Sequence, residues 1–226
     1  MRYLALATDY DGTLARHGQV DAPTLAALER LRASGRALLL VTGRELGELK
    51  KTFSRLDLFD IVVAENGAVL YRPKSPEETI LGPPPPLPFL DMLRARGVPV
   101  FVGRVIVATW EQHQNTVLDV IRALGMDLHM ILNKGAVMVL PPHIDKATGL
   151  AAALAELKLS PHNTVAIGDA ENDHLLLSAC GCGVAVANAT PDLKNRARLV
   201  TRADHGAGVT ELIDRLIADD LASLSL

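Results

Sequence analysis

The sequence has few of the features that mark a membrane-spanning, secreted or nucleic-acid-binding protein. No apolar run approaches the ~18 residues of a membrane span, and the N-terminal apolar stretch, residues 3–8, is too short for the core of a signal peptide. The formal net charge is only −3, which gives no electrostatic case for binding nucleic acid or an anionic membrane. We therefore expect a cytoplasmic monomer or homodimer with neither nucleic acid nor membrane as a partner.

Cysteine is also scarce. The chain has 2 cysteines, Cys180 and Cys182, and neighbours this close rarely form a disulfide. Two cysteines cannot make a structural zinc site without nearby histidines, and no metal-ligand spacing is present among His17, His143, His162, His174 and His205. The pair is therefore expected to be buried and structural.

What the chain does have is an ordinary globular composition, with 49% hydrophobic and 22% charged residues among 226. Short apolar runs alternate with helical patterns, which indicates βαβ units and a parallel sheet covered on both faces. Strands are expected at 3–8, 37–41, 61–64, 164–167, 184–187 and 199–201, with an antiparallel return strand at 68–71. Helices are expected between Asp21 and Gly35 and at 45–53, 146–157, 170–179 and 209–222.

Between residues 72 and 142 the pattern changes. Residues 72–88 are rich in proline and contain four in a row, which predicts a stiff, extended hinge and not a helix or central strand. An αββαββ pattern follows at 89–95, 98–102, 105–109, 112–124, 128–132 and 136–140, and Asn133-Lys134-Gly135 joins the last two strands as a hairpin. We predict a doubly wound, mostly parallel, Rossmann-like α/β core (residues 1–81 and 143–226) with a small α+β module inserted at 82–142.

Polar residues follow several of the buried runs, where open parallel sheets bind their ligands. The candidates are Asp9, Asp11, Thr42, Gly43, Arg44, Glu65, Asn66, Asp169, Asn172 and Asp173, with Lys146 at the start of a helix. Three carboxylates in one crevice repel one another unless a cation lies among them. Because all the ligands are oxygens, the sequence predicts a Mg²⁺ site.

This set of residues is sufficient for phosphoryl transfer. One carboxylate can displace a phosphorylated leaving group and form an acyl phosphate. A second carboxylate two residues further on can protonate the departing alcohol and later deprotonate a water molecule. A hydroxyl, a lysine and backbone N–H groups can stabilise the transferring phosphoryl oxygens.

Four segments resemble the motifs of the haloacid dehalogenase (HAD) superfamily of phosphatases, in the family's order. They are Asp9-Tyr10-Asp11-Gly12-Thr13-Leu14, then Val41-Thr42-Gly43-Arg44, then Lys146, and then Gly168-Asp169-Ala170-Glu171-Asn172-Asp173. The place of the inserted module resembles the type IIB, Cof-like subgroup, in which such a module caps the core and sets substrate specificity.

The resemblance implies a role for each matching position. The implied catalytic residues are Asp9 as nucleophile, Asp11 as general acid/base, and Thr42 and Lys146 as phosphoryl ligands. The implied metal ligands are Asp9, the Asp11 carbonyl and Asp169. Asp173 either binds the metal through a water molecule or holds the direct ligands in place. The implied substrate contacts are Gly43, Asn172 and Asn188, the last two orienting either substrate or a loop. Arg44 is expected either to contact substrate or to be a solvated arginine at the start of a helix. In the inserted module, four polar residues could face the site, but exposure at the surface is the favoured interpretation for each: Arg104, His113, Asn133 and Lys134.

The expected activity is Mg²⁺-dependent hydrolysis of a small phosphate monoester, either phosphoglycolate or a sugar phosphate, through an aspartyl phosphate. A phosphosugar mutase, which returns the phosphoryl group to the sugar, stays open as an alternative. A phospho-aspartate signalling switch is a further alternative, but its acids would cluster nearer the start of the chain and it would carry no cap. The late pair Asp169 and Asp173 argues against it.

Overall fold

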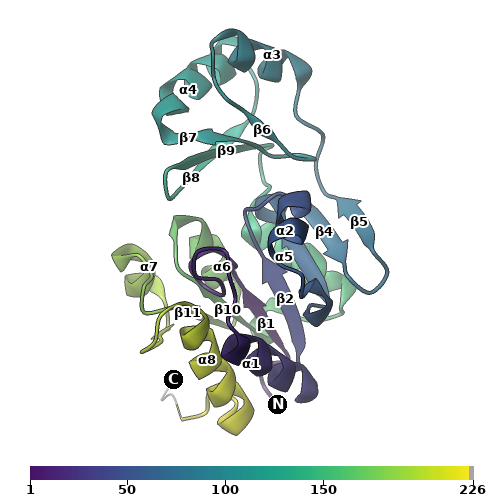
Figure 1. The fold of residues 1–226 in the computed structure, drawn as a ribbon, viewed down its shortest axis with the longest axis vertical. Coiled ribbons are helices and arrows are strands. Elements are labelled where there is room, and N and C mark those ends of the chain that lie inside the picture. The colour runs from purple at the N-terminus through teal and green to yellow at the C-terminus, as the bar shows by residue number, and fades with distance from the viewer. Residues whose placement is uncertain (224–226) are drawn as a thin grey trace.

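The structure, a computed structural model that describes residues 1–223, contains one large sheet and one small one (Figure 1). The large sheet has the order β12-β11-β10-β1-β2-β3-β4-β5. Pairing is parallel from β12 to β3, and β4 and β5 are antiparallel. Its strands are β1 Ala5–Thr8, β2 Ala37–Val41, β3 Ile61–Ala64, β4 Val69–Arg72, β5 Glu77–Ile80, β10 Thr164–Gly168, β11 Cys182–Ala185 and β12 Leu199–Val200.

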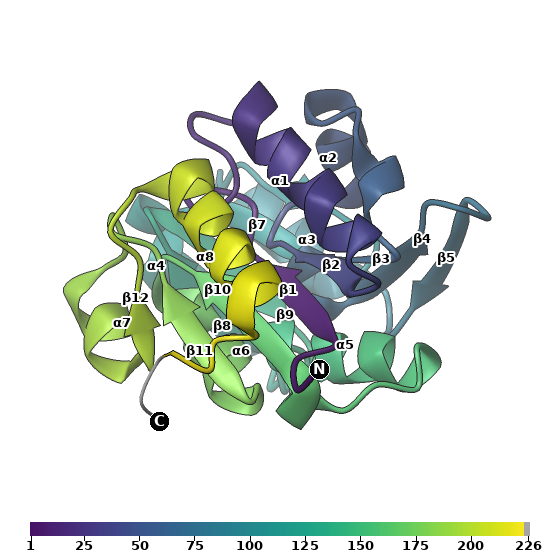
Figure 2. The ribbon, with the colours of Figure 1, turned by 90° about the horizontal axis from the view of Figure 1, so that it is seen from below.

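Helices cover both faces of this sheet, which confirms the doubly wound α/β prediction. The long helices α1 (Ala22–Ala33) and α8 (His205–Asp219) lie side by side on one face, and α5 (Lys146–Glu156) and α6 (His174–Ala179) cover the other (Figure 2). The Asp21 side chain caps α1 by accepting a hydrogen bond from a backbone N–H in its first turn. Two shorter helices complete the core, α2 (Leu46–Thr52) and α7 (Pro191–Arg196).

The inserted module, the name we use for residues 82–142, has its own sheet and its own apolar core. Its elements are α3 Leu87–Ala95, β6 Phe101–Val102, β7 Val107–Trp110, α4 Gln114–Ala123, β8 His129–Asn133 and β9 Ala136–Leu140. The sheet is antiparallel, in the order β6-β7-β9-β8. Helix α4 buries Val117, Val120 and Ile121, spaced for one helix face, in the module's apolar cluster. The exact bounds 82–142 stay a prediction.

The sequence did not predict two elements. Within 72–88, where only a helix and a central strand were excluded, Glu77–Ile80 forms β5 at the edge of the large sheet. An edge strand tolerates flanking prolines, because one side of it needs no partner. Helix α7 was not predicted; Thr190 caps it and Pro191 occupies its first turn. The strand predicted at 184–187 is displaced to Cys182–Ala185 (β11). The strand predicted at 98–102 is shortened to Phe101–Val102 (β6).

Glu65 joins the inserted module to the core. Its carboxylate is fully buried and accepts hydrogen bonds from three consecutive backbone N–H groups of the module, those of Arg104, Val105 and Ile106, at 2.9, 2.9 and 3.0 Å. Glu65 lies in a tight turn with Gly67, whose φ of +106° favours glycine and whose Cα packs against the backbone of α5. The end of β3 thus fixes one side of the module.

No helix among residues 1–223 is both long and apolar enough to cross a membrane.

The two cysteines are free; Cys182 is buried as expected, whereas Cys180 is only partly buried. Desolvation raises the pKa of Cys180 to about 12 and also raises the pKa of Cys182. Because the thiolate is the reactive form, we expect a disulfide reagent at pH 8 to label the native protein at least ~10-fold more slowly than the guanidinium-unfolded protein. The test is the absorbance of the released thiol over time. Equal labelling rates would contradict the structural assignment of this pair.

Candidate active site

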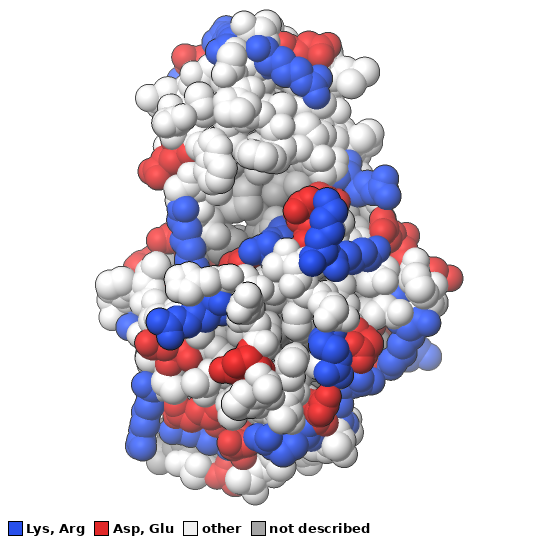
Figure 3. Space-filling model, in the orientation of Figure 1, with Lys and Arg blue, Asp and Glu red and all other residues white. Residues whose placement is uncertain are grey.

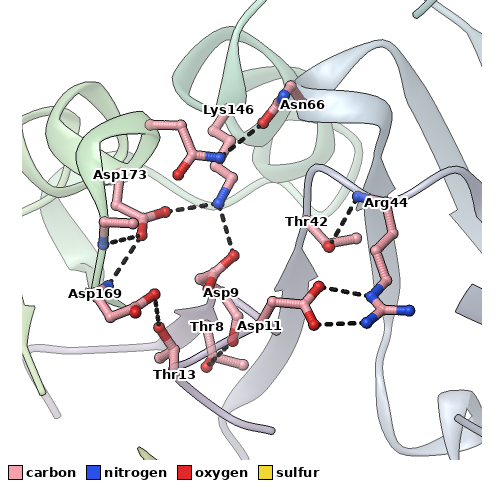
Figure 4. Close-up of polar contacts among 12 residues, drawn as sticks. Thr8, Asp9, Asp11, Thr13, Thr42, Arg44, Asn66, Lys146, Asp169 and Asp173 are labelled. Carbon is pink, nitrogen blue, oxygen red and sulfur yellow. Dashed lines mark hydrogen bonds and ion pairs between the residues drawn. The ribbon is translucent and has the colours of Figure 1, made fainter. Parts of the chain in front are cut away.

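The carboxyl ends of three neighbouring strands bring the predicted residues to one edge of the large sheet (Figure 4). Asp9 follows β1, Thr42 follows β2 and Asp169 follows β10. Lys146 enters from the first position of α5, which Asp145 caps. All four side chains are buried, with 4% or less of each residue exposed.

A buried ion-pair network surrounds Asp9. Lys146 Nζ donates hydrogen bonds to Asp9 Oδ1 at 2.6 Å and to Asp173 Oδ1 at 2.7 Å. Desolvation raises the pKa of Asp9 to about 7; the charge of Lys146 opposes this rise, and the charges of Asp173 and Asp169 add to it. Desolvation acts to lower the pKa of Lys146, but the charges of Asp173 and Asp9 outweigh it and raise that pKa, so Lys146 is an ammonium ion.

The carboxylates of Asp9, Asp169 and Asp173 form an acidic cluster in which one oxygen of each lies within 4.8 Å of the others. Asp173 Oδ2 is held by the backbone N–H groups of Asp169 and Ala170 at 3.0 and 3.1 Å. The Oδ1 atom of Asn172, which lines the adjacent cavity, is buried without a hydrogen-bond partner. A group of oxygen donors with excess negative charge and one unpartnered oxygen nearby fits a hard divalent cation.

Asp11 occupies the rim of the site. Its carboxylate accepts two hydrogen bonds from the Arg44 guanidinium, from Nε at 2.6 Å and from Nη2 at 2.7 Å, while its side chain stays 40% exposed. Arg44 N–H in turn donates to Thr42 Oγ1 at 3.1 Å. The side chain of Asp11 therefore points to Arg44, whereas its backbone carbonyl points toward the acidic cluster.

A cavity of about 680 Å³ lies between the core and the inserted module, and the hollow is visible in Figure 3. The core contributes the predicted residues Asp9, Asp11, Thr42, Gly43, Arg44 and Asn172. The module contributes a largely apolar wall: Phe101, Val102, Gly103, Ile106, Ala108, Asn133, Ala136 and Met138. Such a cavity has the size of a small-molecule site.

Asn188 is the one predicted site residue that neither lines this cavity nor belongs or bonds to the acidic cluster. Its Nδ2 donates to the Gly12 carbonyl and its Oδ1 accepts from His205 N–H, both at 2.7 Å. It therefore connects the loop after β1 to the start of α8. This placement fits the loop-orienting alternative given for Asn188, and its contact with substrate stays a prediction.

Lys134 and Asn133 follow the less favoured of their two interpretations, because both face the site. The Lys134 side chain is 44% exposed, but its Nζ donates to Asp169 Oδ2 at 2.6 Å and to the Asp11 carbonyl at 2.9 Å. Asn133 beside it lines the cavity. The one available signal was their position at the tip of a hairpin in the inserted module.

Comparison with known proteins agrees with this geometry. Residues 6–81 and 105–213 match the family model of the haloacid dehalogenase-like hydrolases. A phosphoglycolate phosphatase of Methanothermobacter thermautotrophicus is 30% identical, over 94% of this chain and 98% of that protein. A haloacid dehalogenase-like hydrolase from Bacteroides thetaiotaomicron has the same fold, with a TM-score of 0.82 at 20% identity over 95% of this chain and 99% of that one. A sugar phosphatase of HAD subclass IIB also has this fold, with a TM-score of 0.77 at 21% identity over 94% of this chain and 98% of that one.

The fold, the site and these similarities define an enzyme, a hydrolase of the phosphatase type. The chain belongs to the haloacid dehalogenase-like hydrolase family, which confirms the resemblance drawn from the four motifs.

Proposed function

We propose that the protein is a Mg²⁺-dependent phosphatase that hydrolyses a small phosphate monoester through an aspartyl phosphate on Asp9. The observation that carries this proposal is the position of Asp9. Its carboxylate is buried at the floor of the cavity, 2.6 Å from an ammonium ion and beside two further acids. A carboxylate removed from water and oriented by a fixed cation is suited to attack phosphorus.

The metal would be held by Asp9, by Asp169 and by the Asp11 carbonyl, and Asp173 would orient these ligands without binding the ion directly. Once bound, Mg²⁺ would neutralise part of the charge of the acids and of the phosphoryl oxygens. Asp173 is already bonded to Lys146 and to two backbone N–H groups, so it suits an orienting role better than direct contact with the ion.

In the first half of the reaction, an Asp9 oxygen attacks phosphorus and the bond from phosphorus to the leaving oxygen breaks. Lys146, the Thr42 hydroxyl and the Gly43 N–H would bind the transferring oxygens. Asp11 gives its proton to the leaving oxygen, so an alcohol departs. To do so, Asp11 must exchange one of its two bonds to Arg44 for that oxygen.

In the second half, Asp11 accepts a proton from a water molecule, whose oxygen attacks the aspartyl phosphate. Inorganic phosphate leaves and the Asp9 carboxylate is restored. Asn172, on the cavity wall, has an unpartnered Oδ1 that can accept a hydrogen bond from the substrate, while its Nδ2 donates to Asn66 Oδ1.

Phosphoglycolate is the substrate that we propose first, because the relative aligned over 94% of this chain is a phosphoglycolate phosphatase. A sugar phosphate is the second candidate, since the cavity of about 680 Å³ is large enough for one and a neighbour in fold is a sugar phosphatase. The apolar wall of the inserted module would exclude water from either substrate.

A substrate panel tests this proposal. Phosphoglycolate, hexose phosphates and p-nitrophenyl phosphate are incubated with Mg²⁺ or with EDTA, and both free phosphate and isomerised sugar phosphate are measured. We expect phosphate release that falls at least ~100-fold in EDTA, because the metal neutralises charge in the transition state. Isomerised sugar without free phosphate would identify a mutase. A long-lived acyl phosphate with little release would identify a signalling switch, and activity unchanged in EDTA would contradict the metal.

A further inference from the structure

The tip of the β8–β9 hairpin reaches from the inserted module into the acidic cluster. In Figure 1, β8 is the strand of the module that faces the core above α6, and it packs against the turn Glu171–Asp173. Lys134 lies in the hairpin turn and is the only lysine among residues 82–142. Its ammonium contacts Asp169 Oδ2 and the Asp11 carbonyl, at 2.6 and 2.9 Å.

In the proposed metal site, the Asp169 carboxylate and the Asp11 carbonyl are ligands of the cation. A divalent cation would approach them to about 2.1 Å, and an ammonium ion on the same oxygens would repel it. The surroundings leave little room for both. A side chain at Gly12 would meet the Lys134 ammonium and the Asp169 carboxylate at once, so these groups already fill the space over the loop.

We propose that Lys134 and Mg²⁺ compete for the Asp11 carbonyl and the Asp169 carboxylate, so that metal binding releases the β8–β9 hairpin from the core. This inference rests on the proposed metal site. Because linkage is reciprocal, docking of the hairpin weakens metal binding by the same factor by which the metal weakens docking.

Two of the polar connections between module and core, those of Glu65 and Lys134, differ in a way that supports this. The Glu65 carboxylate is fully buried and holds three backbone N–H groups, so it is a permanent anchor. Lys134 ends a flexible side chain that is 44% exposed, and it can leave without unfolding anything. Release of the hairpin would move Asn133 and Ala136, which line the cavity, away from Asp9 while the anchored side stays in place. The metal would thus open the cavity to the substrate.

Calorimetric titration with Mg²⁺ tests the competition directly on the full chain. In the Lys134→Met variant we expect the Mg²⁺ dissociation constant to fall at least ~5-fold relative to wild type, the lower end of typical coupling between sites. Arg104→Met is the matched control, because it removes one positive charge from an exposed side chain of the same module that pairs with Glu78. We expect that control to stay within about twofold of wild type. The difference should persist in 0.3 M salt, which screens long-range repulsion but not direct contact.

Hydrogen exchange of residues 129–137 tests the release. In wild type, Mg²⁺ should speed exchange in this segment and leave α4 unchanged; in Lys134→Met, exchange should be fast in EDTA and insensitive to Mg²⁺. Lys134→Gln is a second variant that we expect to behave as Lys134→Met, so the result does not depend on one substitution. Thermal melting shows whether both variants are folded. Equal Mg²⁺ affinity in wild type and both variants, or hairpin exchange that Mg²⁺ leaves unchanged, would overturn this inference alone. No Mg²⁺ binding in any protein would overturn the proposed metal site as well.

Discussion

Asp9→Asn is expected to abolish turnover and to leave the fold intact. The amide has nearly the volume of the carboxylate and can still accept the hydrogen bond from Lys146, but it carries no nucleophilic charge. We expect kcat to fall by about 10⁴-fold or more, as when a residue that forms the covalent intermediate is removed. Phosphate release with saturating substrate and Mg²⁺ measures this. Asp57→Asn, on an exposed side chain that pairs with Arg55, is the matched control and should keep full activity.

The same variant should be at least as stable as wild type at pH 8 in EDTA. Burial raises the pKa of Asp9 to about 7, above the ~3.9 of an unfolded aspartate, so ionised Asp9 destabilises the folded state at pH 8. A neutral amide removes that cost. A melting temperature equal to or above wild type would show that lost activity comes from lost chemistry. More than about 1% of wild-type activity would contradict the role of Asp9.

The core was predictable because its signals are local. The runs at residues 37–41 and 61–64 are buried at every position except Ala37, and the structure places β2 and β3 at those bounds. The site residues could be placed together because β10, β1 and β2 are neighbours in the sheet, so the residues that follow these strands meet at one edge. Order along the chain and the parallel arrangement were enough to bring Asp9, Thr42 and Asp169 together.

The contacts between module and core were not predictable in this way. They depend on the relative orientation of two separately packed units, and no periodicity in the sequence encodes that orientation. Glu65 was noted as the polar end of a strand, but its three partners lie on the other unit, about forty positions away. Lys134 has the same sequence context as any lysine in a hairpin turn, where a solvated side chain is the usual outcome.

Lys146→Met is expected to remove both activity and a large part of the stability. It leaves Asp9 and Asp173 buried without the cation that lies 2.6 and 2.7 Å from them. Removing one partner of a buried ion pair costs about 3–5 kcal/mol, and losing a ligand of the phosphoryl group should lower kcat by about 10³-fold. Urea unfolding and phosphate release measure the two effects. Lys51→Met is the control, because its pair with Glu48 is exposed and screened by solvent, so its loss should leave stability and activity nearly unchanged.

The stability deficit of Lys146→Met should depend on pH. In wild type, the cost of ionising Asp9 on folding begins above the ~3.9 of the unfolded state and is complete near pH 7, the pKa that burial gives it. Without Lys146 that pKa rises further, so the cost keeps growing above pH 7, and the deficit should be larger at pH 8.5 than at pH 5.5. Adding Asp173→Asn to Lys146→Met should restore part of the stability and none of the activity. A deficit independent of pH, or a double variant that recovers turnover, would mean that Lys146 does not act by balancing these two carboxylates.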